Sequence, residues 1–190
     1  LEGDVGSGKT VVAAMALFNA AINKYQGALM APTEILAGQH YQSLQKLLEG
    51  FNVKIALLSG SRAEANFELP KNKIERREKI IKEAEIIIGT QALIQNYSIP
   101  KLALVIVDEQ HRFGVRQRQK LQQSGGGLWP HFLSMTATLI LRSLALAIYG
   151  DLDLSLIKEL PQNRRPIITK VIAEEQRDQA YGFTRQQIAK

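Results

Sequence analysis

The chain has 190 residues, of which 45% are hydrophobic and 22% are charged, a composition typical of a folded globular protein. Its formal net charge of +6 favours a polyanionic partner such as nucleic acid, although a nucleotide pocket would also account for it. Cysteine is absent, which excludes disulfides and thiolate metal sites, and no apolar run approaches the ~18 residues of a membrane span, so we expect a soluble cytoplasmic protein without a membrane partner.

The first predicted element is a phosphate-binding loop. The sequence L-E-G-D-V-G-S-G-K-T contains the pattern G-x-x-x-x-G-K-[ST]. Its glycines let backbone N–H groups surround a phosphate chain, its lysine reaches the outer phosphates, and its threonine binds Mg²⁺. The apolar helix predicted next would point its positive end at the anion. The loop predicts a nucleotide site formed by Gly3, Gly6, Ser7, Gly8, Lys9 and Thr10.

Alternating apolar segments predict the fold class. Short runs rich in Ile, Val, Leu or Ala predict buried strands at 28–31, 54–58, 85–88, 102–107 and 131–135. Helix-like stretches lie at 11–23, 35–48, 74–84 and 142–149. This order is typical of an α/β fold with a parallel β-sheet and helices on both faces. Because only Leu1 and Glu2 precede the loop, we expect a sheet truncated before its first strand.

The composition changes after Gly150. Residues 151–166 contain two prolines, acidic residues alternating with leucines, and a basic pair, which together predict a linker between domains. A strand at 167–172 and a helix at 178–188 follow, with little to pack against. We therefore interpret 1–150 as one domain, 151–166 as a linker and 167–190 as the incomplete start of a second α/β domain.

Two acidic residues predict the chemistry. The strand at 102–107 ends at Asp108 and Glu109, and open α/β sheets bind ligands at the carboxyl ends of their strands. One carboxylate could bind Mg²⁺ while its neighbour orients the attacking water. Taken alone, such a pair is more often a solvated strand end, but beside a phosphate loop it predicts nucleotide hydrolysis.

The hydroxyl-rich segment S-M-T-A-T at 134–138 ends the next predicted strand. Its hydroxyls would emerge beside Asp108 if the two strands are neighbours in the sheet. His111 could then report the state of the nucleotide to these hydroxyls, although a lone histidine after a strand is more often a core or surface residue.

Taken in order, these motifs resemble those of superfamily 2 helicases. Besides the phosphate loop they include A-P-T-E-I-L-A at 31–37, G-T-Q-A-L-I at 89–94, D-E-Q-H-R-F-G-V at 108–115 and S-M-T-A-T. D-E-Q-H-R-F-G-V and the tail G-D-L-D-L-S at 150–155 are similar to the RecG family of branch-migration helicases. The resemblance implies a RecA-like P-loop NTPase lobe: the first, ATP-binding lobe of a DNA helicase that remodels replication forks and Holliday junctions.

The resemblance also implies roles for single residues. Catalysis would fall to Glu109, Lys9 and His111, and Mg²⁺ binding to Thr10 and Asp108. Hydrolysis would be coupled to motion by Gln110, His111, Ser134, Thr136 and Thr138. The DNA backbone would be contacted by Pro32, Thr33, Ser59, Gly60, Gly89 and Thr90, for which ordinary turn and capping chemistry is the alternative.

The partners follow from the same resemblance. It implies ATP and Mg²⁺ as cofactors, branched or double-stranded DNA and single-stranded DNA-binding protein as partners, and a monomer in the bacterial cytoplasm or nucleoid. Three alternatives remain open: a double-stranded DNA translocase of the transcription-repair coupling factor type, a P-loop GTPase or kinase, and a catalytically inactive DNA-binding fragment. Without the second lobe, whose arginines complete the ATP site, we expect this chain alone to be weakly active or inactive.

One segment departs from the family pattern. Relatives continue T-A-T with Pro-Ile-Pro-Arg, whereas this chain has Leu139 and Leu141 in place of the two prolines. Losing both prolines frees Thr138 and Ile140 to enter a helix. We hypothesise that coupling is weakened while nucleotide binding survives; a sequencing error is the alternative.

Overall fold

The computed structural model describes residues 1–90, 93, 97–109, 130–137, 153–159, 169 and 171–188. They belong to two units, Leu1–Leu160 and Pro161–Lys190, which are described separately. The predicted helix at 142–149 lies outside the described residues, as do Leu139, Leu141 and three of the predicted site residues: Gln110, His111 and Thr138.

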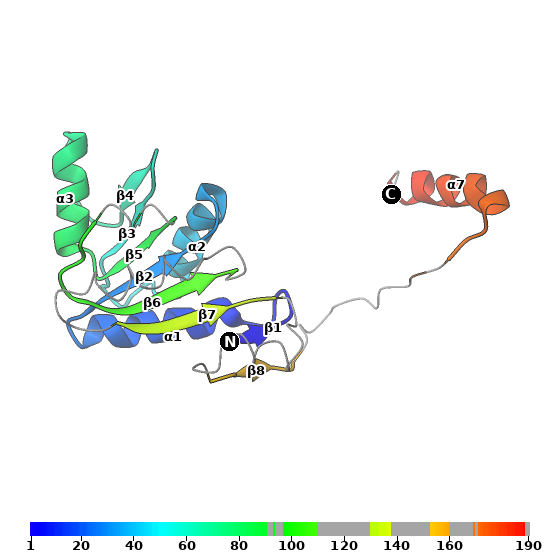
Figure 1. The fold of residues 1–190 in the computed structure, drawn as a ribbon. Coiled ribbons are helices and arrows are strands. Elements are labelled where there is room, and N and C mark those ends of the chain that lie inside the picture. Colours follow the sequence, from blue (N-terminus) through cyan, green and yellow to red (C-terminus); the bar gives the residue numbers. More distant parts are fainter. Residues whose placement is uncertain are drawn as a thin grey trace. The chain divides into compact units, whose positions relative to one another are not determined.

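A six-stranded sheet in the order β4-β3-β5-β2-β6-β7 forms the centre of the first unit (Figure 1). All neighbouring strands are parallel except β4, which runs antiparallel to β3 at the edge. The predicted parallel α/β fold is therefore confirmed. The strands are β2 (Gln26–Met30), β3 (Ile55–Leu58), β4 (Ala63–Ala65), β5 (Ile86–Gly89), β6 (Leu102–Asp108) and β7 (His131–Met135).

Three helices connect these strands, each within two residues of its predicted bounds: α1 (Lys9–Ile22), α2 (Glu34–Leu47) and α3 (Lys73–Glu83). Polar side chains cap two of them. The Thr33 hydroxyl accepts a hydrogen bond from Leu36 N at 3.3 Å, and the Asn72 side chain accepts one from Ile74 N at 2.9 Å. α1 instead begins after Gly8, without a side-chain cap.

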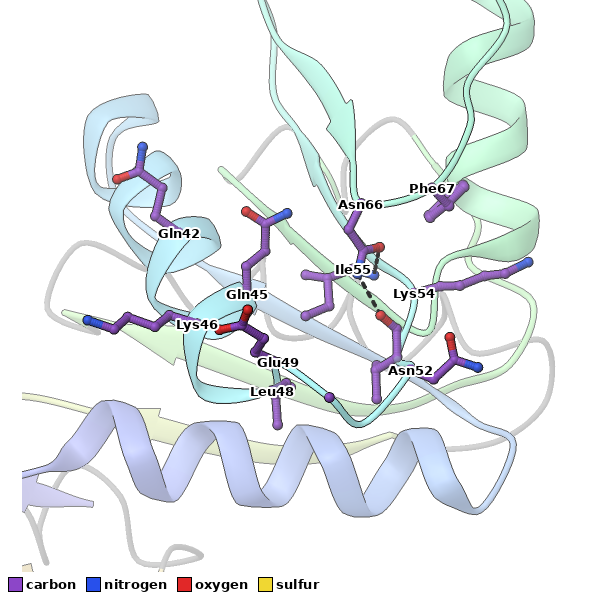
Figure 2. Close-up of a pocket in the computed structure, with 12 residues that line it drawn as sticks. Gln42, Gln45, Lys46, Leu48, Glu49, Asn52, Lys54, Ile55, Asn66 and Phe67 are labelled. Atoms are coloured by element: carbon purple, nitrogen blue, oxygen red, sulfur yellow. Dashed lines mark hydrogen bonds between the residues drawn. The ribbon is translucent and has the colours of Figure 1, made fainter.

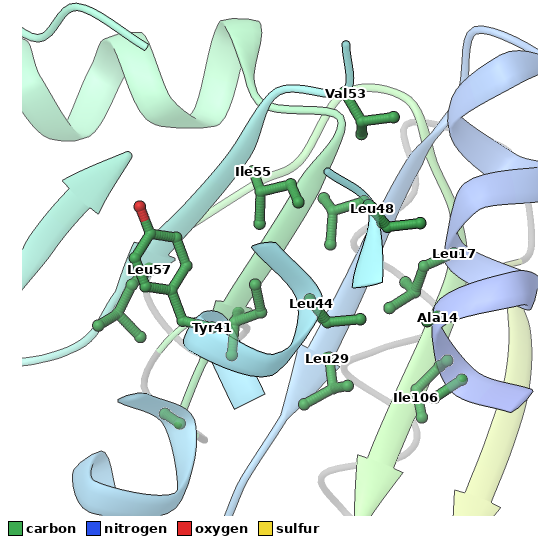
Figure 3. Packing of buried hydrophobic residues seen from close by; sticks show 14 of the residues in the cluster. Ala14, Leu17, Leu29, Tyr41, Leu44, Leu48, Val53, Ile55, Leu57 and Ile106 are labelled. Carbon is green, nitrogen blue, oxygen red and sulfur yellow. The ribbon is translucent and has the colours of Figure 1, made fainter. Parts of the chain in front are cut away.

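Apolar side chains cover both faces of the sheet. Along β3, Ile55 and Leu57 face α1 and α2, whereas Ala56 and Leu58 face the side covered by α3. The same alternation along β2 and β5 explains why these strands read as continuous apolar runs. Figure 3 shows the apolar cluster on the face that α1 and α2 cover, where α2 packs against the strands. Its labelled members include Leu29, Tyr41, Leu44, Leu48, Ile55 and Leu57.

A second, very short parallel pair joins β1 (Glu2–Gly3) to β8 (Leu156–Ile157). A single bridge between Glu2 and Thr136 connects β1 to the end of β7. Sequence analysis assigned no strand here and read 156–157 as part of a linker. Two residues cannot show an alternating pattern, and the three residues of edge strand β4 were missed for the same reason.

The second unit contains a 3₁₀ turn, η2 (Glu174–Gln176), and α7 (Arg177–Ile188). The helix expected at 178–188 is therefore present. The strand expected at 167–172 is wrong at its described residues, because 169, 171 and 172 pair with no described strand and Val171 is fully exposed. That this segment begins a second domain stays a prediction. None of the described helices has the length and apolarity required to cross a membrane.

Gly89 provides a test of the sheet packing. A Cβ on this residue would collide with the carbonyl oxygen of Leu58 and lie 3.3 Å from Leu93 Cβ. The backbone of β3 and β5 can shift only by weakening the hydrogen bonds between these strands. We therefore expect Gly89→Ala to lower the free energy of unfolding, measured by urea titration, by about 1–3 kcal/mol.

Gly60→Ala is the matched control. Its Cβ would meet Glu34 Oε1 at 3.3 Å, at the free end of a side chain. We expect a change within about 0.5 kcal/mol. Equal losses for the two variants would contradict the packing argument.

Candidate functional site

The predicted site residues that the structure describes lie along one edge of the sheet. Parallel strands place their carboxyl ends side by side, so the loops that follow β3, β5, β2, β6 and β7 form one row. The segments that follow β3, β5 and β2 hold the residues predicted to contact DNA: Ser59, Gly60, Gly89, Thr90, Pro32 and Thr33. The ends of β6, β7 and β1 hold the residues predicted to serve the nucleotide: Asp108, Glu109, Ser134, Thr136 and the loop from Gly3 to Thr10.

The backbone of the loop exposes unpaired donors. Gly6 and Gly8 have φ angles of 79° and 99°, in the left-handed region that favours glycine. Val11 N and Val12 N both donate to the Gly8 carbonyl oxygen, at 2.9 and 3.3 Å. Among the described residues, no acceptor pairs with the N–H groups of Gly6, Gly8, Lys9 and Thr10. Backbone N–H groups at a helix N-terminus that have no partner among the described residues are suited to bind an anion.

The Lys9 side chain folds back over this loop. Its ammonium Nζ donates to the carbonyl oxygens of Gly3 and Asp4, at 2.7 and 2.9 Å. Ser7 Oγ is buried without a hydrogen-bond partner among the described residues, and a Cβ on Gly3 would collide with it. The closely wound backbone, the positive charge and the unpaired hydroxyl fit a phosphate group.

Asp108 ends β6 and Glu109 follows it, and both carboxylate oxygens of Asp108 have hydrogen-bond partners. Asp108 Oδ2 lies 2.8 Å from His40 Nε2, and Oδ1 accepts from Glu109 N at 3.1 Å. Glu109 N also donates to the Met135 carbonyl oxygen at 3.0 Å. Glu109 has a φ of 53°, a left-handed conformation that costs a non-glycine residue about 1–2 kcal/mol. This strained turn fixes the point from which its side chain leaves the strand.

Sequence analysis missed His40. It lies on α2, and no spacing in the sequence connects it to an aspartate 68 residues later. Only the packing of α2 against the sheet brings the two side chains together, so no sequence signal could have identified this contact.

The end of β7 is attached to the start of the loop. β6 and β7 are neighbours, with Val107 opposite Ser134, as the prediction for the hydroxyl cluster required. Gly3 N donates to the Thr136 carbonyl oxygen at 3.3 Å, and Thr136 N donates to that of Leu1 at 3.2 Å. The hydroxyl-rich segment therefore lies against the loop backbone.

The described residues form no metal site of three or more protein ligands. No group of three or more His, Asp or Glu residues gathers in a metal-binding arrangement within the part of the chain that the structure describes. Mg²⁺ in nucleotide sites takes only one or two protein ligands and completes its shell with phosphate oxygens and water. Thr10 and Asp108 are ligands of the types that such a site uses.

The loop after β3 is held from two sides. Ser61 Oγ and Ser61 N donate to the Glu34 carboxylate, at 2.5 and 3.2 Å. The Arg77 guanidinium of α3 donates to the carbonyl oxygens of Gly60 at 2.7 Å and Ser59 at 3.3 Å. Gly60 and Thr33 are exposed at the edge, whereas Ser59 and Gly89 are buried. The exposed members of this set are therefore the ones placed to meet a ligand directly.

A shallow hollow of about 600 Å³ lies elsewhere on the first unit (Figure 2). It lies between the end of α2 and the start of β3, at the amino ends of the strands. Asn66 lines it, and its side chain hydrogen-bonds to the backbone at the start of β3. Its Oδ1 accepts from Ile55 N at 2.8 Å, and its Nδ2 donates to the Val53 carbonyl oxygen at 2.7 Å. None of the predicted site residues that the structure describes lines this hollow.

Comparison with known proteins identifies similar sequences and folds. A family model described as DEAD/DEAH box helicase matches residues 1–147. ATP-dependent DNA helicase RecG from Aquifex aeolicus is 46% identical over the whole chain, which covers 24% of that protein, and RecG from Streptococcus pneumoniae is 50% identical with 27% covered. A solved structure of RecG bound to a three-way DNA junction superposes over the whole chain with a TM-score of 0.79 and 38% identity, and 24% of it is covered.

These matches confirm the resemblance to the RecG family that the motifs predicted. The chain spans about a quarter of the length of these relatives.

The Glu34 contact makes the loop after β3 sensitive to acid. Hydrogen bonds from the side chain and backbone of Ser61, and then from Ser59, lower the pKa of Glu34 below its ordinary value of 4.5. A lowered folded-state pKa stabilises the loop above pH 4.5, and that contribution is lost as the pH falls through the folded-state pKa.

We expect Ser61→Ala to move the pKa of Glu34 back toward 4.5 in an NMR titration of its carboxyl carbon. Ser43→Ala, at an exposed position on the same helix, should leave that pKa unchanged. A Glu34 pKa that does not respond to the loss of the Ser61 hydroxyl would refute this assignment.

Proposed function

The chain belongs to the DEAD/DEAH box helicase family, and from that membership we propose that it is the ATP-binding motor lobe of a DNA helicase that remodels branched DNA. The observation that carries the proposal is the strand order: the residues predicted to serve the nucleotide follow β6, β7 and β1, whereas those predicted to contact DNA follow the neighbouring strands β2, β5 and β3. Its similarity to RecG proteins, one of them solved on a three-way DNA junction, supports branched DNA as the substrate over the transcription-repair alternative.

In the nucleotide half, the loop would hold the phosphates of ATP. The Lys9 ammonium would exchange the carbonyl oxygens of Gly3 and Asp4 for the outer phosphate oxygens. Mg²⁺, held by Thr10 and Asp108 when bound, would neutralise charge on those oxygens. Glu109 would orient the attacking water from its fixed turn. His111 and Gln110 complete the proposed set, with Ser134, Thr136 and Thr138 coupling hydrolysis to motion.

In the other half, main-chain and hydroxyl groups would bind the DNA backbone. Thr33 and Gly60 are exposed at the edge, and Pro32 and Thr90 are partly exposed beside them. Such groups position a nucleic acid without reading its bases, as expected of a motor that acts on DNA of any sequence. Ser59 and Gly89 would act through the loops that they shape rather than by contact.

The larger assembly is part of the same proposal. Residues 1–150 would form the first RecA-like lobe, 151–166 the connection between lobes and 167–190 the start of the second lobe. The division of the chain into two units near residue 160 supports this arrangement. We propose a monomer acting in the bacterial cytoplasm or nucleoid, with single-stranded DNA-binding protein as a further partner.

Lys9 gives the direct test of the nucleotide site. We expect Lys9→Ala in the intact protein to lower the rate of fork-stimulated ATP hydrolysis by about 10²–10³-fold. The substitution removes the positive charge that would stabilise the negative charge developing on the phosphate oxygens. Lys46→Ala, at an exposed lysine of α2, should leave the rate unchanged. Equal rates for wild type and Lys9→Ala would favour the reading as an inactive DNA-binding protein.

Thr90 tests the backbone-binding half. Thr90→Val keeps the shape of the side chain and removes its hydroxyl. If that hydroxyl donates a hydrogen bond to a DNA phosphate, the affinity for a DNA fork, measured without ATP, should fall by about 3- to 10-fold. The loss should be equal for forks of different sequence. Fluorescence anisotropy with two fork sequences provides the measurement. A loss confined to one sequence, or none at all, would count against the assignment.

A further inference from the structure

One side-chain contact crosses the division between the two halves of the sheet edge. α2 begins immediately after Thr33, in the half proposed to meet DNA, and carries His40 two turns further on. The imidazole Nε2 of His40 lies 2.8 Å from Oδ2 of Asp108, the carboxylate proposed to bind Mg²⁺. Both side chains are largely buried, with exposed fractions of 12% and 16%.

The contact fixes the orientation of the carboxylate. An ionised carboxylate can only accept hydrogen bonds, so Nε2 carries the proton that is donated to Oδ2. The second oxygen, Oδ1, accepts from Glu109 N at 3.1 Å. With one donor on each oxygen, the carboxylate plane is held against rotation. Each oxygen has two lone pairs, and one on each is left for a further ligand.

The helix that carries His40 is itself rigidly seated. Ala37, Tyr41 and Leu44 of α2 are buried in the core, and His40 lies between the first two of them in the sequence. Thr33 caps the first turn, and Glu34 in that turn holds Ser61 of the neighbouring loop. The His40 ring is therefore presented by a packed helix rather than by a mobile loop.

From this geometry we propose that His40 is a positioning residue for nucleotide hydrolysis, which holds the Asp108 carboxylate in the orientation that Mg²⁺ requires. The proposal rests on the proposed function, because it assigns His40 a role toward the metal of that same site. Hydrogen-bond partners of metal ligands typically change metal affinity by about 10–100-fold when removed. His40 would thus affect the Mg²⁺ requirement of the site without contacting nucleotide.

The test compares three variants of the intact protein. His40→Leu removes the donor, and His40→Gln keeps an N–H donor on a side chain of comparable reach. Gln39→Leu places the same new side chain on the neighbouring, exposed position of α2 as a control. The first readout is the equilibrium affinity for a fluorescent ADP analogue, measured over a range of Mg²⁺ concentrations and again in excess chelator, so that no turnover is involved.

We expect the Mg²⁺ concentration that half-maximally enhances nucleotide binding to be at least about 10-fold higher for His40→Leu than for wild type. Nucleotide affinity in excess chelator should be unchanged. His40→Gln should restore most of the Mg²⁺ dependence, and Gln39→Leu should match wild type. Thermal denaturation of each variant accompanies these measurements. If His40→Leu lowers the melting temperature but leaves the Mg²⁺ dependence intact, the contact is merely structural and the proposal is overturned.

The result also separates this proposal from the one on which it rests. If the wild-type protein shows no Mg²⁺-dependent nucleotide binding, the proposed function fails. If the wild type shows that dependence and His40→Leu shows the same one, only the role of His40 is refuted. Loss of nucleotide affinity in chelator as well would also refute it, because a carboxylate-positioning residue should leave metal-free binding unaffected.

Discussion

Parallel pairing of β2, β5, β6 and β7 is the constraint on which the rest of the site depends. Each parallel neighbour must return to the same end of the sheet before it can pair, so every connecting loop of interest emerges at one edge. Burial of both faces of the sheet against apolar side chains makes that arrangement stable. Residues that are far apart in the sequence consequently become neighbours along a single line.

The strand order then divides this line. Because β2 and β6 are adjacent, the loop that starts α2 lies next to Asp108, while β7 and β1 carry the phosphate loop on the far side of β6. The helix α2 connects the two halves of this line, because it begins after β2 and its His40 side chain contacts Asp108 at the end of β6.

Most of the sheet could be predicted from the sequence, because apolar runs of four to seven residues record burial on both faces. The position of Asp108 followed from the end of such a run, and that of Lys9 from the pattern G-x-x-x-x-G-K-[ST]. Contacts between side chains of distant elements could not be predicted. His40 with Asp108 and Glu34 with Ser61 depend on how α2 seats on the sheet, and no local pattern encodes that packing.

The pairing of β1 with β8 has a consequence for how the protein folds. Glu2 and Gly3 pair with Leu156 and Ile157, and Glu2 N donates to the Ser155 carbonyl oxygen at 2.9 Å. The strand that leads into the phosphate loop thus pairs with a segment that lies near the other end of the first unit in the sequence. Contacts of such long range form slowly, because the intervening chain must first be ordered. During synthesis, Glu2 and Gly3 can take up this pairing only after residue 157 has left the ribosome.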